Sequence, residues 1–215
     1  MDNFDSEYSA TPDLFGAEPE SSLARFANRL DPSRTLLDVG CGQGRNSLYL
    51  ARRGLTVDAL DPSQVAVEQV GRAAAAHDLP IRTIQGTFQD LGDTGRDYSG
   101  IFVFGLIPVL TRLQIGELVR AVDTHLGRGG HLWITAFGTW DPDYPLRAAD
   151  WVEEDRNSFR SPDGRLRTYL ESGELVALFP GLETIHSWEG LGPEHRHGDG
   201  PVERHGMAEA VLRRG

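Results

Sequence analysis

The chain has 215 residues, of which 39% are hydrophobic and 25% charged, so it can bury one sizeable core and is expected to form a single domain with appendages. Its 21 basic and 32 acidic residues give a formal charge of −11, which argues against a protein that binds the nucleic-acid backbone. A basic substrate or another small molecule suits this charge better.

The first 30 residues are an acidic leader, and the main domain is expected to span residues 31–215. The leader begins MDNFDSEYS and lacks the basic and apolar parts of a secretory signal. The longest apolar run, IFVFGLIPVL, is about half as long as a membrane-spanning helix. The single cysteine, Cys41, rules out an internal disulfide and suits a reducing compartment. We therefore expect a cytoplasmic protein without a membrane segment.

From residue 35 onward, strand-like and helix-like segments alternate, which is typical of a parallel sheet with helices on both faces. The expected strands are residues 35–39, 55–61, 81–86, 100–110 and 131–137. The expected helices are residues 45–53, 62–78, 112–126 and a short one within 171–181.

Local signals support several of these elements. Asp61 and Pro62 are expected at the N-cap and first position of the second helix. Thr111 and Gln114 form the pattern of a capping box in front of the third. The fourth strand is apolar throughout, as a strand buried on both faces should be, and residues 127–130 (GRGG) are expected to turn into the fifth.

After residue 137 the pattern changes. Residues 138–170 are rich in Pro, Asp, Gly and Trp without a clean period, and we expect a long excursion beside the carboxyl edge of the sheet, on the substrate side. Residues 182–192 and 202–214 are expected to form a closing hairpin. The predicted fold is therefore α/β: a doubly wound, mostly parallel seven-stranded sheet with an antiparallel hairpin at its C-terminal edge.

The loop after the first strand places glycine at positions 40, 42 and 44, where a ligand can approach the main chain closely. Asp61 ends the second strand, where a carboxylate can accept two hydrogen bonds from a ribose diol. A dinucleotide fingerprint would need glycine at the position of Arg45, which disfavours a nicotinamide oxidoreductase. Asp38, two residues before Gly40, suits a ligand that carries an ammonium group.

Residues 36–54 (LLDVGCGQGRNSLYLARRG) and 57–63 (VDALDPS) resemble the glycine loop and acidic second strand of class I S-adenosylmethionine methyltransferases. Residues 126–135 resemble the turn that opens the fifth strand of the same proteins, so the likeness covers about residues 30–137. Within the class, residues 41–54 and 193–214 are similar to the tellurite-resistance methyltransferases.

This resemblance implies an enzyme that transfers a methyl group from the cofactor S-adenosyl-L-methionine to a small-molecule acceptor. The implied cofactor-binding residues are Asp38, Gly40, Cys41, Gly42, Arg45, Asn46, Asp61, Pro62, Thr87, Phe88, Gln89 and Phe104. The family's catalytic His-Arg pair falls on His195 and Arg196. In similar enzymes the leader folds over the cofactor as a lid.

The acceptor is left open. Arg196 would orient a chalcogen oxyanion such as tellurite or selenite, whereas His195 or His197 could remove a proton from a thiol, phenol or amine. An apolar pocket for a larger organic acceptor could instead be lined by Trp140, Tyr144, Trp151 and Trp188. A non-catalytic cofactor-binding domain on the same fold is a further alternative. A monomer or homodimer is expected.

Several histidines stand near the C-terminal end of the chain. They are His186, His195, His197 and His205, with Glu194 beside them. None of them shows the H-x₃₋₅-H or C-x-x-C spacing that is typical of zinc sites. No metal is therefore expected.

Overall fold

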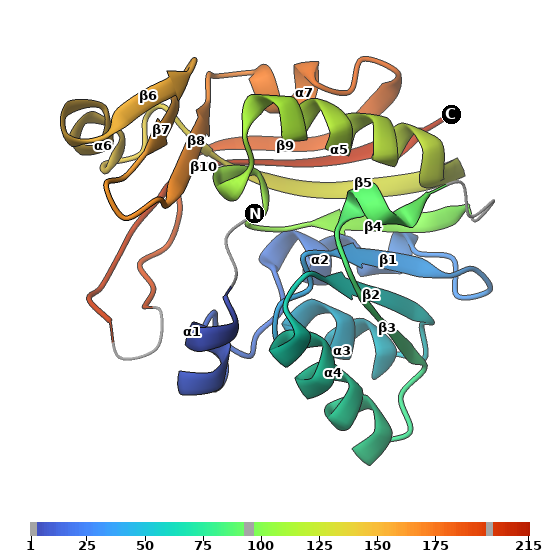
Figure 1. Cartoon of the computed structure of the whole chain (residues 1–215). Coiled ribbons are helices and arrows are strands. Elements are labelled where there is room, and N and C mark those ends of the chain that lie inside the picture. The colour runs from blue at the N-terminus through green and yellow to red at the C-terminus, as the bar shows by residue number, and fades with distance from the viewer. Residues whose placement is uncertain (1–3, 93–96, 197–199) are drawn as a thin grey trace.

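The computed structural model describes residues 4–92, 97–196 and 200–215. Five parallel strands form the centre of its sheet in the order β3-β2-β1-β4-β5 (Figure 1). Their bounds are β1 Leu36–Val39, β2 Val57–Asp61, β3 Ile81–Gln85, β4 Tyr98–Val103 and β5 Leu126–Gly138. β1, β2 and β4 are buried along their whole length, as the apolar run predicted for β4.

A hairpin of two long strands completes the expected seven-stranded sheet. β10 (Gly206–Arg214) pairs antiparallel with β5, and β9 (Leu182–Leu191) pairs antiparallel with β10. The chain thus reverses at the C-terminal edge, and the predicted fold class is confirmed. Among the described residues, no helix combines the length and apolar character needed to cross a membrane.

Helices lie on both faces of this sheet (Figure 1). On one side are α3 (Arg45–Ala51) and α4 (Gln64–Ala76), and on the other are α5 (Arg112–His125) and the short α7 (Glu174–Ala177). The predicted capping box before α5 is confirmed: the Thr111 hydroxyl accepts from the Gln114 N–H, and the Gln114 side chain accepts from the Thr111 N–H. The stripe of α5 that includes Ile115 and Leu118 is buried against the sheet.

The predicted cap of α4 is wrong. The helix begins two residues later than expected, and its N-cap is Ser63, whose hydroxyl accepts from the Ala66 N–H at 3.1 Å. The reason is that the Asp61 carboxylate is already engaged, because it accepts from the backbone N–H groups of Gly42 and Ser63. Asp61 therefore joins the strand end to the glycine loop and does not cap the helix.

Two strand boundaries also differ from the prediction. β4 ends at Val103, and the rest of the apolar run turns through a 3₁₀ segment, η3 (Ile107–Val109), because Pro108 has no N–H for a ladder and Gly105 has a φ of +66°. The GRGG segment lies inside β5, where Gly129 has a φ of +71° and the register with β4 is irregular. It is a break within a strand and not a turn in front of one.

Residues 138–170 are more regular than their composition predicted. They contain α6 (Tyr144–Asp150) and an antiparallel meander of β6 (Val152–Asp155), β7 (Ser158–Arg160) and β8 (Leu166–Leu170). β8 pairs with the end of β5, where Phe137 lies opposite Tyr169, so the described sheet has ten strands. The excursion does lie at the carboxyl edge of β5, as expected.

The leader contains two helices, α1 (Asp5–Ala10) and α2 (Ser21–Phe26), followed by the 3₁₀ segment η1 (Ala27–Arg29). Leu23 of α2 is fully buried in a core cluster with Leu36 of β1 and Trp133 of β5. α1 lies beside α4 at the lower side of the sheet (Figure 1). The second half of the leader is therefore anchored in the main core, and its first half packs at the sheet's edge.

Candidate active site

The glycine loop follows β1 and needs its glycines for two reasons. Gly40, Gly42 and Gly44 have φ values of +73°, +51° and +86°, which L side chains rarely adopt. In addition, a Cβ on Gly44 would lie 2.6 Å from a methyl carbon of Val70, and one on Gly42 would lie 2.9 Å from the Tyr8 hydroxyl oxygen. At Gly42 and Gly44, side chains of the protein itself therefore leave no room for a Cβ, whether or not a ligand is bound.

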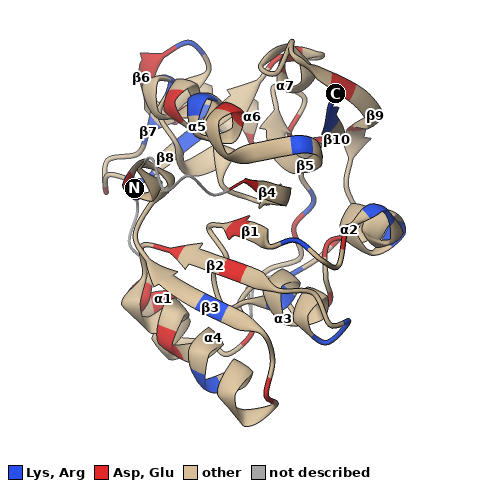
Figure 2. Cartoon of the chain, turned by 90° about the vertical axis from the view of Figure 1, so that its right-hand side faces the viewer, with Lys and Arg blue, Asp and Glu red and all other residues tan. Residues whose placement is uncertain are grey.

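Two buried carboxylates flank this loop, and Figure 2 shows acidic positions on both β1 and β2. Asp61 is 5% exposed and accepts from the Gly42 N–H at 2.8 Å and the Ser63 N–H at 2.9 Å. Burial raises the pKa of Asp61, and these two N–H groups act against the rise. Asp38 accepts from the Ser47 hydroxyl at 2.6 Å, and burial raises its pKa to about 6. With a pKa of about 6, Asp38 is mainly anionic at neutral pH.

Cys41 lies between these carboxylates within the loop. Its side chain is buried, and burial raises the pKa of the thiol well above its usual value, with Asp38 and Asp61 adding to the rise. A thiol that stays protonated is a poor nucleophile. Cys41 therefore shapes the loop and offers no covalent chemistry.

The leader is held to the glycine loop by side-chain hydrogen bonds. The Gln43 amide donates to the Thr11 carbonyl at 3.0 Å and accepts from the Leu14 N–H at 2.7 Å. Arg45 forms an ion pair with Glu20, whose N–H donates to the Asn46 side chain at 2.9 Å. The role of Gln43 in holding the leader was not predicted from the sequence. The one signal for it was a long amide side chain between two glycines.

A cavity of about 310 Å³ lies between the glycine loop, the leader and the end of β4. Phe4, Tyr8 and Phe15 of the leader line it, and their ring centroids lie 5.8–6.3 Å apart. Eight predicted cofactor residues also line it: Gly40, Cys41, Gly42, Arg45, Asn46, Asp61, Pro62 and Phe104. The tertiary structure has therefore gathered most of the predicted set around one space.

Four predicted cofactor residues lie outside this lining. Asp38 is buried beneath the loop. Thr87 and Phe88 line a smaller neighbouring cavity, which shares Gly40, Pro62 and Leu106 with the larger one. Gln89 lines neither, and its amide donates to Glu117 on α5 at 2.7 Å.

The predicted catalytic pair lies in the loop between β9 and β10 and does not line the cavity. This loop leaves the sheet beside Phe137, at the end of β5, which is the same edge as the glycine loop because β1 and β5 are parallel to β4. His195 pairs with Glu203 through two backbone hydrogen bonds, and the exposed Arg196 donates to the Gly200 carbonyl. His197 falls outside the described residues.

The aromatic residues proposed for an apolar acceptor pocket have other partners. The Trp140 ring N–H donates to the Gly190 carbonyl, Tyr144 packs against Phe159, and Trp151 lies under Arg147. Trp188 is 42% exposed on β9. None of the four proposed aromatics lines the 310 Å³ cavity.

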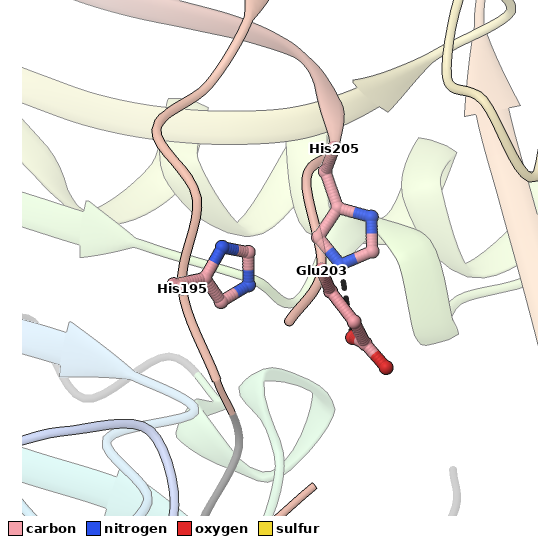
Figure 3. A group of neighbouring side chains, drawn as sticks. All are labelled: His195, Glu203 and His205. Carbon is pink, nitrogen blue, oxygen red and sulfur yellow. Dashed lines mark ion pairs between the residues drawn. The ribbon is translucent and has the colours of Figure 1, made fainter. Parts of the chain in front are cut away.

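The structure also brings together three side chains that the spacing of the histidines did not single out. His195, Glu203 and His205 each present one ligand atom, and these atoms lie within 4.8 Å of one another (Figure 3). The spacing of these residues in the sequence does not reveal the cluster, because His195 and Glu203 meet across an antiparallel bridge and not along one helix.

Comparison with known proteins gives a consistent picture. A family model described as a methyltransferase domain matches residues 36–130. The chain is 30% identical over 179 residues to a ubiquinone biosynthesis O-methyltransferase of Caulobacter sp. (strain K31), covering 73% of this chain and 67% of that protein. It is 29% identical over 173 residues to hemagglutinin 1 of Eikenella corrodens, covering 80% of this chain and 54% of that protein.

A further relative is known in both sequence and structure. The chain is 26% identical over 161 residues to the probable S-adenosyl-L-methionine-dependent methyltransferase TehB of Haemophilus influenzae (strain 10810), covering 70% of this chain and 50% of that protein. The crystal structure of TehB from H. influenzae superposes with a TM-score of 0.71 at 20% identity, covering 91% of this chain and 62% of that one. The chain thus spans about half the length of its Eikenella and Haemophilus relatives.

Proposed function

The chain belongs to the class I S-adenosylmethionine-dependent methyltransferases, and from this premise we propose that it transfers the methyl group of that cofactor to a small molecule held at the carboxyl edge of the sheet. The observation that carries the proposal is the Gly42 to Asp61 hydrogen bond, which fixes the Asp61 carboxyl group at the wall of the 310 Å³ cavity.

The residues at the cavity fit this cofactor. Each oxygen of Asp61 accepts one backbone N–H, so each keeps a lone pair with which to accept from a ribose hydroxyl. The charges of Asp38 and Asp61 favour a ligand with ammonium and sulfonium groups. Phe4, Tyr8 and Phe15 offer ring faces, which attract cations. When bound, S-adenosylmethionine supplies a methyl group on a positively charged sulfur, which is already a good electrophile.

The leader is proposed to act as a lid over the bound cofactor. Its aromatic residues form one wall of the cavity, and the hydrogen bonds of Gln43, Arg45 and Asn46 hold it against the glycine loop. A closed lid excludes water and keeps the acceptor in line with the methyl group, and such positioning can supply much of the rate of a methyl transfer.

For the acceptor we propose a small anion or a thiol, met by His195 and Arg196. The guanidinium of Arg196 can neutralise an anion, and a neutral imidazole can take a proton. Both residues are in a loop at the same sheet edge as the cavity. A large aromatic acceptor is less well supported, because Trp140 and Trp151 have other partners and Trp188 is exposed on β9.

The chain contains a matched control for testing Asp61, because the tripeptide Asp-Pro-Ser occurs twice. In both copies the aspartate accepts from the serine N–H at 2.9 Å, but Asp31 is exposed and does not line the cavity. Asp61→Ala should lower the affinity for S-adenosylhomocysteine more than about 100-fold, since two charge-assisted hydrogen bonds are lost. Asp31→Ala should leave that affinity unchanged in the same calorimetric titration.

Turnover is tested by incubating the chain with S-adenosylmethionine and a panel of tellurite, selenite, thiols, phenols and amines while following S-adenosylhomocysteine. The expected result is product with an anionic or thiol acceptor and a loss of product in His195→Ala/Arg196→Ala. No heat with either cofactor form would overturn the proposal at the binding step. If the chain binds the cofactor but methylates none of these acceptors, the proposed methyl transfer is wrong and the chain is a cofactor-binding domain.

A further inference from the structure

The loop between β9 and β10 gathers three potential metal ligands from two facing segments (Figure 3). His195 and Glu203 lie opposite each other in an antiparallel bridge, with N to O distances of 3.0 and 2.8 Å. His205 follows Glu203 by two residues, so in extended chain both side chains point to the same side. The arrangement therefore depends on the bridge that holds the two segments together.

The hydrogen-bond partners of the two imidazoles select the same tautomer in each ring. The Nδ1 of His205 lies 3.1 Å from Oδ2 of Asp141, a carboxylate with a side chain 1% exposed that also accepts from the Gly206 N–H. The Nδ1 of His195 lies 3.2 Å from the Pro193 carbonyl oxygen. Both partners can only accept, so each Nδ1 carries a hydrogen, and the lone pair of a neutral ring is on Nε2.

Glu203 brings the third potential ligand. Its Oε2 lies 3.6 Å from Nε2 of His205. The ligand atom of His195 lies within 4.8 Å of both, so a single metal ion can contact all three side chains.

We propose that His195, Glu203 and His205 bind a divalent ion of the zinc class. Bonds of about 2.0–2.1 Å in a tetrahedral zinc site require ligand atoms about 3.3 Å apart, close to the 3.6 Å between Glu203 and His205. Asp141 and the Pro193 carbonyl orient the two rings, as carboxylates and carbonyls do behind metal-bound histidines. Three protein ligands leave a fourth position open, which is the pattern of a catalytic site and not of a structural one.

The open position gives the ion a role in the reaction, and this part rests on the proposed function. A thiol acceptor that binds there would lose its proton to solvent, because a metal-bound thiol is deprotonated. Its sulfur would then form the new bond to the methyl carbon as the bond from that carbon to the sulfonium sulfur breaks. His195 acts in this scheme as a metal ligand and not as a base.

The test is calorimetric titration of the untagged full chain with ZnCl₂, together with the visible spectrum after addition of Co²⁺. One ion per chain and a tetrahedral cobalt spectrum are expected. Glu203→Gln and His205→Ala should weaken zinc binding more than about 100-fold, and Asp141→Asn by about 10–100-fold, the range found for groups that orient metal ligands. His186→Ala is the matched control, because His186 pairs with Glu209 at 3.2 Å in the same hairpin, with no third ligand beside them among the described residues.

S-adenosylhomocysteine binding, measured on every variant, reports folding and separates the two proposals. Zinc binding that is absent from the parent chain, or equal in His205→Ala, overturns the metal site even if the cofactor still binds. Nitrogen NMR signals of a doubly protonated His205 ring that zinc does not alter would also overturn it, since the cluster would then be an ion pair only. Zinc binding without cofactor binding would overturn the proposed function and leave the metal site intact.

Discussion

Replacing Gly42 by alanine tests whether the leader and the glycine loop act as one unit over the cavity. Gly42 has a φ of +51°, a conformation that costs a residue with a side chain about 1–2 kcal/mol. For a chain of this size, that strain should lower the melting temperature by about 2–8 °C. The new Cβ would also lie 2.9 Å from the Tyr8 hydroxyl oxygen, so the Tyr8 side chain must move away from the loop.

Gly54→Ala separates these two effects. Gly54 has a φ of +81°, but no atom lies within 4 Å of an added Cβ. Backbone strain should therefore lower the thermal stability of both variants, and Gly42→Ala should lose more because Tyr8 is also displaced. Backbone strain is present with and without cofactor, so it cancels from the binding free energy. Only Gly42→Ala displaces Tyr8, and it alone should weaken S-adenosylhomocysteine binding by about tenfold, or about 1.4 kcal/mol, the size of one or two lost hydrogen bonds.

Calorimetric titration measures these affinities, and hydrogen exchange over residues 5–15 reports the state of the leader. Exchange should accelerate in Gly42→Ala and stay unchanged in Gly54→Ala. Tyr8→Phe removes the oxygen that the new methyl group meets, so the double variant Tyr8→Phe/Gly42→Ala should regain most of the lost affinity. Equal cofactor affinity in Gly42→Ala and Gly54→Ala would refute the reasoning.

Burial raises the pKa of Asp38 to about 6 from 3.8, so its anion destabilises the folded chain: the free energy of unfolding should fall as the pH rises from about 4 to about 6, and chemical denaturation of Asp38→Asn should lack this component. Affinity for the cationic cofactor should rise with Asp38 ionisation over the same range and stay flat in Asp38→Asn; a flat profile in the parent chain would count against its electrostatic role. Gln43→Ala, which removes bonds to Thr11 and Leu14, should lower the free energy of unfolding by about 1–3 kcal/mol. Gln89→Ala, at the exposed bond to Glu117, should lower it by less than about 0.5 kcal/mol, and equal effects would show that the leader adds no stability.

Much of the central fold could be predicted because its signals are local. A buried parallel strand reads as an apolar run, as in β1 and β4, and the Thr111 to Gln114 box marks where α5 begins. The end of β4 was predicted wrongly for a local reason, the conformations of Gly105 and Pro108. The cap of α4 was predicted wrongly because of a distant contact: the Asp61 carboxylate accepts from the Gly42 N–H, and Ser63 caps the helix.

The meander of residues 138–170 was missed because its strands are short and lack alternation. β6 is exposed at all four positions, and β7 has three residues, so neither shows a buried face in sequence. These strands form because β8 adds to the end of β5 and the others pair onto it. The pairing of β8 with β5 joins residues that are distant along the chain, so no local sequence pattern predicts it.

The amino-acid order by itself identified the strands and helices of the parallel core, the glycine loop and the carboxylate at the end of β2, because the signal for each lies within a few residues. Only the tertiary structure decided that Gln43 fastens the leader over the cavity and that His195, Glu203 and His205 converge. Those contacts join segments separated by eight or more residues, and their geometry exists only once the sheet has brought its carboxyl edge together.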